Sequence, residues 1–177
     1  MASEMEGNES SYELCILRHG IAADRALGAR GGDAKRPLTP EGRERVEEIA
    51  KGLARIGFAP QWVVSSPYVR AADTARIVAA GLGPRVPLDC CEALEPGGSP
   101  EALLAFLAKN PERRPVLVVG HEPDLSELAA RLTGAGRDAN FAFKKGGCCL
   151  ISFDQFPPSS PGRLVWWLTP RILRKLA

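Results

Sequence analysis

Short apolar runs separated by helix-like segments dominate this 177-residue chain and constrain its fold. One run, residues 13–17, leads into Arg18-His19-Gly20, and another, residues 115–120, leads into His121. Runs rich in Val, Ile and Leu that stop at glycine are typical of interior strands of a parallel sheet. Ligands of open α/β sheets bind beyond the carboxyl ends of such strands. We therefore expect the chain's two histidines to meet at one site, although about 100 positions separate them.

Segments with helical periodicity alternate with these runs. Thr39, Ser66 and Ser99 each precede a proline, the pattern of an N-cap followed by the first helical residue. A fourth helix is expected to end at Gly134. The last two strands are separated only by a stretch rich in proline, serine and glycine, which favours a hairpin. The predicted fold class is α/β, a three-layer α/β/α sandwich with a mainly parallel sheet and an antiparallel edge. The expected strands are residues 12–17, 61–65, 86–91, 116–119, 148–153 and 164–168.

The composition is that of an ordinary globular protein, with 45% hydrophobic and 25% charged residues. A net charge of +2 gives no reason to expect nucleic acid or a membrane as partner, and no apolar run approaches the roughly 18 residues of a membrane span. We expect residues 1–11 to be a disordered tail without signal-peptide character, and residues 12–177 to form one domain. The five cysteines form no Cys-x-x-Cys motif, which favours reduced thiols and a cytoplasmic protein.

The first candidate site is Arg18-His19-Gly20. A neutral imidazole is a good nucleophile near pH 7, and a guanidinium group offers a fixed fork of donors to phosphate. Gly20 would let the backbone approach a ligand closely. The alternative is a strand-end histidine that only satisfies backbone carbonyls, and these three residues alone do not decide between the two interpretations.

Two further segments favour the phosphate interpretation. Ser66-Pro67 and Arg70 lie where a strand is followed by a helix, and a helix N-terminus with an arginine in its first turn can bind an anion. By itself this is more typical of an ordinary capped helix with a solvent-facing arginine. Gly120-His121 lies at another strand end. Two arginines, two histidines and a helix start at one sheet edge together indicate phosphate chemistry.

These motifs resemble the histidine phosphatase superfamily, also called phosphoglycerate-mutase-like. Arg18-His19-Gly20, Arg36-Pro37-Leu38-Thr39, Ser66-Pro67-x-x-Arg70-Ala71-x-x-Thr74 and Gly120-His121 occur in the family's order. The compact length, Arg-Pro-Leu-Thr and the closing Leu168-Thr169-Pro170-x-x-Leu173 are most similar to the SixA-type phosphohistidine phosphatases. The resemblance extends over residues 13–174, nearly the whole chain.

The resemblance implies a role for each matching residue. His19 would be the nucleophile that becomes phosphorylated, and Arg18, Arg70 and His121 would complete a phosphate pocket. Arg36 and Gly20 would contribute to substrate binding. The resemblance implies no metal and no cofactor, and the sequence shows no metal-ligand spacing of its own.

The general acid is left open among three carboxylates. Glu95, at the end of the third expected strand, best fits the mutase-like position, and Glu122 occupies the position that the acid-phosphatase branch uses. Glu92 is the third candidate. A phosphohistidine substrate lessens the need for an acid, because imidazole is a far less basic leaving group than an alkoxide.

Three functions follow as hypotheses. The leading one is removal of phosphate from phosphohistidine on a partner protein, such as a phosphotransfer domain, with the loop from Ile21 to Lys35 contacting that partner. Only about a dozen residues join the second helix to the region of Glu95, too few for the inserted cap that would enclose a small substrate. The second hypothesis is a phosphatase of small phosphomonoesters. The third is a non-catalytic phosphate-binding module, which the intact His19, Arg18 and Arg70 argue against.

Overall fold

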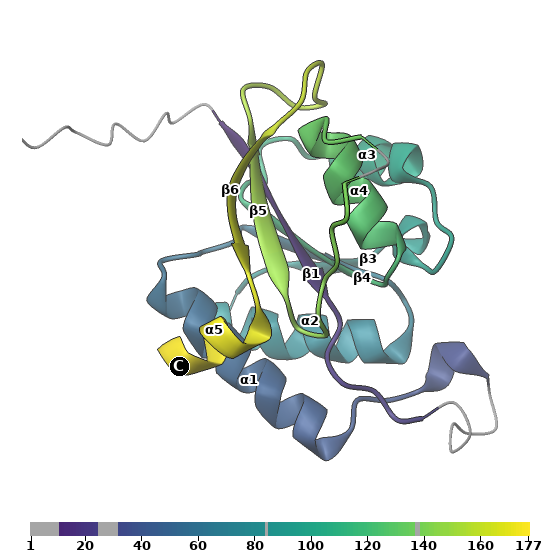
Figure 1. Cartoon of the computed structure of the whole chain (residues 1–177), viewed down its shortest axis with the longest axis vertical. Coiled ribbons are helices and arrows are strands. Elements are labelled where there is room, and N and C mark those ends of the chain that lie inside the picture. The colour runs from purple at the N-terminus through teal and green to yellow at the C-terminus, as the bar shows by residue number, and fades with distance from the viewer. Residues whose placement is uncertain (1–10, 25–31, 84, 137–138) are drawn as a thin grey trace, which may run out of the picture.

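A six-stranded sheet forms the centre of the computed structural model, which describes residues 11–24, 32–83, 85–136 and 139–177. The strand order is β3-β2-β4-β1-β5-β6 (Figure 1). Strands β1, β2, β3 and β4 pair in parallel, whereas β5 pairs antiparallel with both β1 and β6. The strands are β1 (Tyr12–Arg18), β2 (Trp62–Ser65), β3 (Leu88–Cys90), β4 (Val116–Gly120), β5 (Cys148–Phe153) and β6 (Arg163–Leu168).

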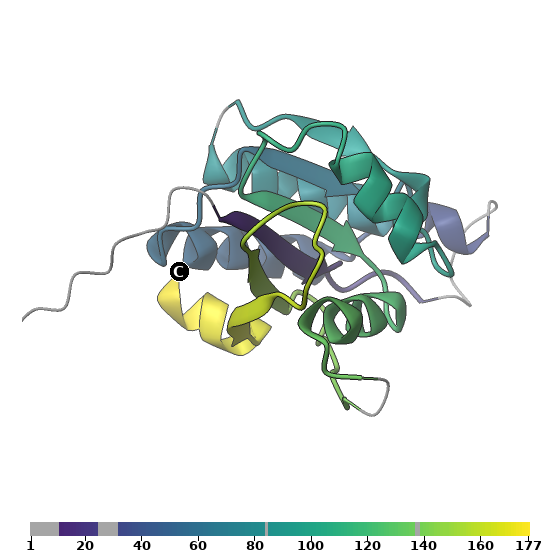
Figure 2. The ribbon, with the colours of Figure 1, turned by 90° about the horizontal axis from the view of Figure 1, so that it is seen from above.

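Helices cover both faces of this sheet, so the molecule has three layers (Figure 2). Along β1, Leu14 and Ile16 point into the core shared with α3 and α4, whereas Cys15 and Leu17 point into the core shared with α1, α2 and α5. Both faces of β1 are therefore apolar, as expected of an interior strand. The helices are α1 (Pro40–Arg55), α2 (Val69–Leu82), α3 (Pro100–Leu107), α4 (Asp124–Thr133) and α5 (Pro170–Leu176), with short 3-10 turns η1 (Asp33–Lys35) and η2 (Glu92–Leu94).

The predicted α/β/α sandwich is confirmed, and the structure shows which strand near its edge is antiparallel. The hairpin β5–β6 is present, but β5 is the antiparallel strand and lies one place in from the edge. Since β6 is antiparallel to β5, it runs in the same direction as β1. Reversal of a single strand therefore joins the hairpin to the parallel part of the sheet.

Two of the three predicted proline-containing helix starts are confirmed. The hydroxyl oxygens of Thr39 and Ser99 accept hydrogen bonds from the first turns of α1 and α3. The prediction for Ser66 is wrong, because α2 begins only at Val69 and has Tyr68 at its N-cap without a side-chain hydrogen bond. Ser66 Oγ instead accepts from the Tyr68 N–H and contacts a histidine of the site described below.

The sequence analysis did not assign the last helix, α5. Its Thr169 caps the helix start and is followed by Pro170, the same signature that identified α1 and α3. The helix packs on α1, where a Cβ atom at Gly52 would come within 2.2 Å of the Leu173 carbonyl oxygen. This close approach holds the C-terminal segment against the sheet layer.

The described parts of the segment between β1 and α1 pair with each other near its two ends. Ala22 bridges Leu38 in antiparallel fashion, and η1 supplies one turn just before Arg36. Arg25 and Arg30, which the sequence analysis places in a partner-contacting loop, lie outside the described residues, as do residues 1–10 of the expected tail.

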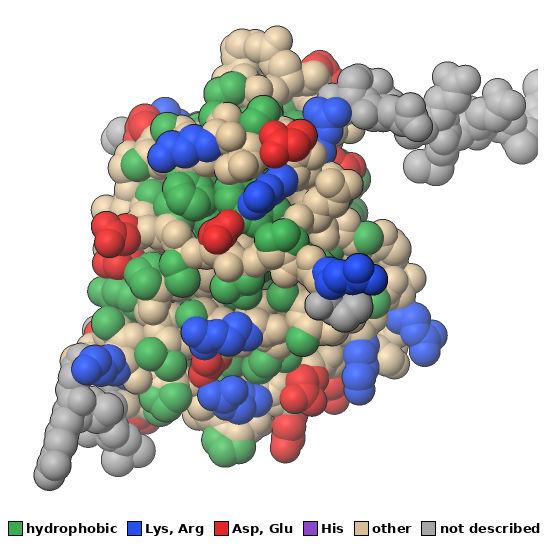
Figure 3. All heavy atoms as spheres, turned by 180° about the vertical axis from the view of Figure 1, so that it is seen from behind, with side chains coloured by type: hydrophobic (Ala, Val, Ile, Leu, Met, Phe, Trp, Pro, Cys, Tyr) green, Lys and Arg blue, Asp and Glu red, His purple; other side chains and the backbone are tan. Residues whose placement is uncertain are grey.

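On the face opposite to that of Figure 1, the Lys and Arg side chains of the described residues are interspersed with Asp and Glu, and hydrophobic side chains are exposed between them (Figure 3). In the described part of the chain, no helix is long and apolar enough to cross a membrane.

Candidate active site

The carboxyl ends of two neighbouring parallel strands bring the two histidines together. His19 directly follows β1, and His121 directly follows β4, the strand that pairs with β1. The His19 N–H donates to the Gly120 carbonyl at 3.2 Å, which continues the sheet pairing past the strand ends. The two imidazole centroids lie 5.0 Å apart, and both side chains are buried. The structure thus places both rings within reach of one small anion.

The hydrogen bonds of His19 fix its tautomer. Nδ1 lies 2.7 Å from the Gly20 carbonyl oxygen, which can only accept, so Nδ1 carries the proton. Arg70 Nε donates to the other ring nitrogen, Nε2, at 3.2 Å, so Nε2 carries the lone pair. A neutral imidazole satisfies both contacts at once, and the nitrogen that carries its lone pair faces the guanidinium group.

Burial keeps both histidines neutral. Desolvation lowers the pKa of His19 to about 3, and the nearby positive charges of Arg70 and Arg18 act in the same direction. Desolvation likewise lowers the pKa of His121 to about 4, with Arg70 again contributing. The imidazole of His19 therefore stays unprotonated at Nε2 well below neutral pH.

This leads to a prediction for the proton NMR spectrum, in which the chain's two histidines give two assignable imidazoles. Neither ring should titrate between pH 5.5 and 8, because both pKa values are lowered to about 3 and about 4. In the unfolded chain both histidines bind protons at the ordinary pKa of about 6.5. The free energy of unfolding should therefore fall as the pH drops below that value. A His19→Gln variant assigns the signals. A titration midpoint near 6.5 for His19 would contradict the description of a buried neutral nucleophile.

Arg70 lies in the first turn of α2 and is 3% exposed. Besides its contact with His19, its Nη1 donates to the Asp33 carbonyl oxygen at 2.7 Å and its Nη2 to Asp33 Oδ2 at 2.9 Å. The guanidinium carbon stands 5.1 Å from the centre of the Tyr68 ring. Thr74 accepts from the Gly20 N–H and donates to the Arg70 carbonyl, which ties the helix to the strand end. Arg70 is therefore held rigidly beside His19.

Arg18, the last residue of β1, points to the other side of the site. Its Nη1 donates to the Phe143 carbonyl at 2.7 Å, and its buried Nε has no hydrogen-bond partner among the described residues. Glu122 accepts from the Phe143 N–H and from the Ser126 hydroxyl. Burial lowers the pKa of Arg18, and the negative charge of Glu122 acts in the opposite direction. A backbone carbonyl thus anchors Arg18, a contact that no side-chain motif in the sequence indicates.

His121 is held by polar and aromatic contacts. Its Nε2 lies 2.9 Å from Ser66 Oγ, and the Tyr68 ring packs edge-on at 5.2 Å between centroids. Its buried Nδ1 has no partner among the described residues. Buried polar atoms are nearly always hydrogen-bonded in folded proteins, so this nitrogen is a candidate contact for a ligand oxygen.

Asp33 is the site residue that the sequence analysis missed. Besides its bonds to Arg70, its Oδ1 lies 2.8 Å from Arg36 Nε, and Arg36 Nη1 donates to the Ala23 carbonyl. Arg36 therefore reaches the site through Asp33. The sequence marks Asp33 only by its place three residues before Arg36, which does not indicate a contact with Arg70.

Gly20 contributes through packing. A Cβ atom there would lie 2.6 Å from Val46 Cγ2 of α1, and the Gly20 N–H is engaged by Thr74. The structure thus provides a packing reason for glycine at this position, beside the ligand approach expected from the sequence.

None of the three candidate acids is hydrogen-bonded to the histidines or arginines within the described ranges. Glu92 is exposed, Glu95 is partly exposed at the end of η2, and Glu122 is occupied by Ser126 and Phe143. Glu122 is linked to Arg18 through the backbone of Phe143. The Phe143 N–H donates to Glu122, and the Phe143 carbonyl accepts from Arg18. The carboxylate in direct contact with the arginines is that of Asp33.

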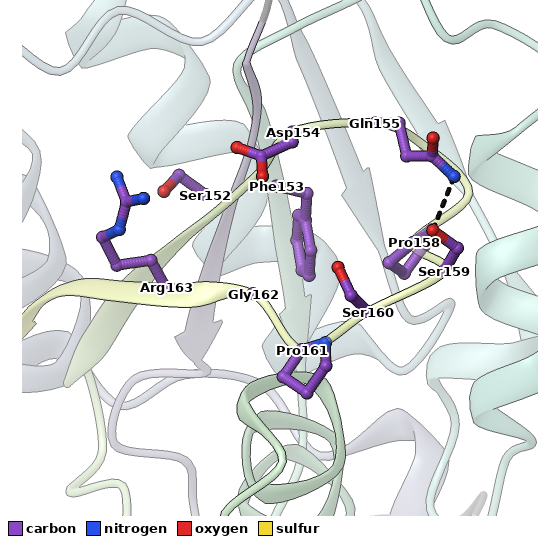
Figure 4. A pocket seen from close by; sticks show the side chains of 10 residues that line it. All are labelled: Ser152, Phe153, Asp154, Gln155, Pro158, Ser159, Ser160, Pro161, Gly162 and Arg163. Carbon is purple, nitrogen blue, oxygen red and sulfur yellow. Dashed lines mark hydrogen bonds between the residues drawn. The ribbon is translucent and has the colours of Figure 1, made fainter.

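A separate hollow of about 170 Å³ lies between β5 and β6, at the opposite end of the sheet from the histidines. Figure 4 shows its lining side chains, with the Gln155 amide hydrogen-bonded to Ser159 at 2.7 Å. It contains no histidine or cysteine. Across the residues the structure describes, no cluster of three or more His, Cys, Asp or Glu could hold a metal ion.

Comparison with known proteins agrees with this geometry. Residues 14–95 match the model of the histidine phosphatase superfamily (branch 1). An uncharacterised protein of Picosynechococcus sp. is 41% identical over 139 residues, which cover 76% of this chain and 81% of that protein. The chain belongs to the histidine phosphatase superfamily, and this membership implies phosphatase activity.

The structural neighbours identify the type within the superfamily. The protein histidine phosphatase SixA complexed with tungstate superposes with a TM-score of 0.78 at 28% identity, covering 91% of this chain and 99% of that one. This confirms the SixA-type resemblance. A mycobacterial glucosyl-3-phosphoglycerate phosphatase has a TM-score of 0.66 at 18% identity, covering 90% of this chain and 99% of its own, and shares the fold alone.

Proposed function

We propose that this protein removes phosphate from phosphohistidine on a partner protein, through a phosphohistidine intermediate on His19. The observation that carries the proposal is the Nε2 lone pair of a buried, neutral His19 in direct contact with Arg70. A nucleophile, a second histidine and three arginines converge there. The positive charge that stabilises a transferring phosphoryl group then comes from guanidinium groups, so we propose that no metal is required.

The first step forms a bond between His19 Nε2 and phosphorus and breaks the phosphorus–nitrogen bond of the substrate. Arg70 Nε, which holds the lone pair in the empty site, would move its hydrogen bond to a phosphoryl oxygen. Arg18 and His121 Nδ1 can contact further oxygens, since both have donors or ring nitrogens without a partner among the described residues. The substrate imidazole leaves and takes a proton from solvent, and the water that attacks in the second step returns one to solvent.

In the second step, water attacks the phosphorus of phospho-His19 and the bond to Nε2 breaks. Phosphate departs and the lone pair returns to Nε2. The proton on Nδ1 stays in place throughout, because the Gly20 carbonyl holds it. The tautomer of His19 is thus the same before and after the cycle.

The open surroundings of the site favour a protein substrate. Between the end of α2 at Leu82 and the start of α3 at Pro100, the described residues form only β3 and η2, without an element that could cap a small molecule. SixA, the neighbour at 28% identity, is described as a protein histidine phosphatase and was found with tungstate, a tetrahedral oxyanion. We propose a phosphotransfer domain as the class of partner. The five free cysteines support a reducing, cytoplasmic setting.

A comparison of substrates tests this proposal. We expect kcat/KM for a phosphohistidine-bearing protein to exceed that for a sugar phosphate or an aryl phosphate by at least about 100-fold, because contacts away from the phosphate lower the barrier. Lys35→Glu, an exposed change beside the site, should lower turnover of the protein substrate several-fold and spare the aryl phosphate. Lys51→Glu on the exposed side of α1 serves as the control.

The alternatives give different results in the same assay. Preference for a small ester would favour a phosphomonoester phosphatase, which the shared fold with the mycobacterial enzyme makes the second candidate. Phosphate binding without turnover of any substrate would indicate a binding module.

A further inference from the structure

In this structure one of the protein's own carboxylates occupies the arginines of the anion pocket. Asp33 Oδ2 accepts from Arg70 Nη2, and Asp33 Oδ1 pairs with Arg36 Nε. The Asp33 carbonyl oxygen takes a further donor, Arg70 Nη1. One aspartate therefore bridges the two arginines, as the oxygens of a bound phosphate would.

The contacts on Arg70 are those that a phosphoryl group on His19 needs. Nε and Nη2 of a guanidinium group point along one edge, which is the edge that binds two oxygens of a phosphate side by side. In this structure the edge is shared between His19 Nε2 and Asp33 Oδ2. Phosphate can use the whole edge only when the carboxylate gives up its place.

The local structure lets Asp33 leave. Its side chain is 33% exposed, whereas that of Arg70 is 4% exposed. It lies at the first position of η1, a three-residue turn on the surface, next to Gly32 in a left-handed conformation at φ 77°. The arginine is thus fixed in the site, and the aspartate is the partner with access to solvent. A buried guanidinium without a counter-charge is unfavourable, so the carboxylate stabilises the site whenever phosphate is absent.

We propose that Asp33 is an internal competitor for the phosphate site, which lowers the affinity for free phosphate and so promotes product release. The inference rests on the proposed phosphate site at His19 and adds a specificity-determining residue to it. A phosphorylated protein can overcome the competition through contacts away from the phosphate, whereas free phosphate has only the contacts of the pocket itself, and Asp33 competes for those made by Arg70. The enzyme would then discriminate against its own product.

Calorimetric titration with inorganic phosphate and with tungstate tests the competition without any turnover. Asp33→Asn keeps the size of the side chain and removes its charge, and we expect it to bind both oxyanions at least about tenfold more tightly than the unmodified protein. Asp33→Ala should change in the same direction. Asp24→Asn removes the same charge from an exposed position of the same segment and should stay within about twofold.

Gain of affinity separates competition from a structural role, since loss of structure would weaken binding. Equal or weaker binding by both Asp33 variants would overturn the proposal and assign Asp33 to the support of Arg70. Equal tightening by Asp24→Asn would also overturn it, because the effect would then be one of net charge. Absence of oxyanion binding in the unmodified protein and in Asp33→Asn would overturn the phosphate site itself, and the competition with it.

Discussion

Replacing His19 with alanine is expected to abolish phosphatase turnover, with a loss on the order of 10⁴-fold or more in kcat, as for other enzymes deprived of their nucleophile. The reason is that His19 Nε2 holds the lone pair that attacks phosphorus, and no other side chain in the described site offers one with the same hydrogen-bonded support. The measurement is steady-state hydrolysis of a phosphohistidine protein.

His19→Gln is the matched variant, because it fills a similar volume at this buried position. It should be equally inactive while its thermal unfolding stays close to that of the unmodified protein. Turnover within about tenfold of normal in either variant would exclude His19 as the nucleophile.

Replacing Arg70 with alanine is expected to lower kcat by about 10²- to 10³-fold, the range observed when one donor to a transition state is lost. Arg70 touches His19 Nε2 directly and is the most deeply buried arginine of the site. Arg70→Lys should recover little of the loss, because an ammonium group cannot present two parallel N–H donors along one edge.

Arg76→Ala is the control for the second prediction. Arg76 lies on the same helix, but its side chain is 64% exposed and pairs with Asp73 on the surface. Its removal should change kcat by less than about twofold. A loss in Arg76→Ala similar to that in Arg70→Ala would mean that damage to α2, rather than a missing phosphate contact, explains both.

The parts of this site that could be predicted from the sequence are those that strand ends determine. His19 and His121 follow apolar runs, so parallel pairing alone brings them to one sheet edge. Thr39 and Ser99 follow the cap pattern and accept from the first turns of their helices, although their hydroxyl groups also donate to the Ile21 carbonyl and to Glu101. Ser66 has the same local sequence, yet its hydroxyl contacts His121, a residue 55 positions away.

The parts that could not be predicted depend on chain turns without periodicity. Asp33 reaches Arg70 because the chain turns at Gly32, and no pattern of apolar residues marks that turn. Phe143 holds Arg18 through a backbone carbonyl, which any residue type could supply. Glu95 lies beyond η2 and not directly at the end of β3, and the order of elements does not determine which way its side chain points.

The most direct test of the central claim is the intact mass of the protein after brief exposure to a phosphohistidine protein or a small phosphoramidate. The mechanism predicts a gain of one phosphoryl group that disappears in acid and survives in base, as a phosphorus–nitrogen bond does. The adduct should map to His19, and it should be absent from His19→Gln. An acid-stable adduct, or an adduct that persists in His19→Gln, would contradict a phosphohistidine intermediate on His19.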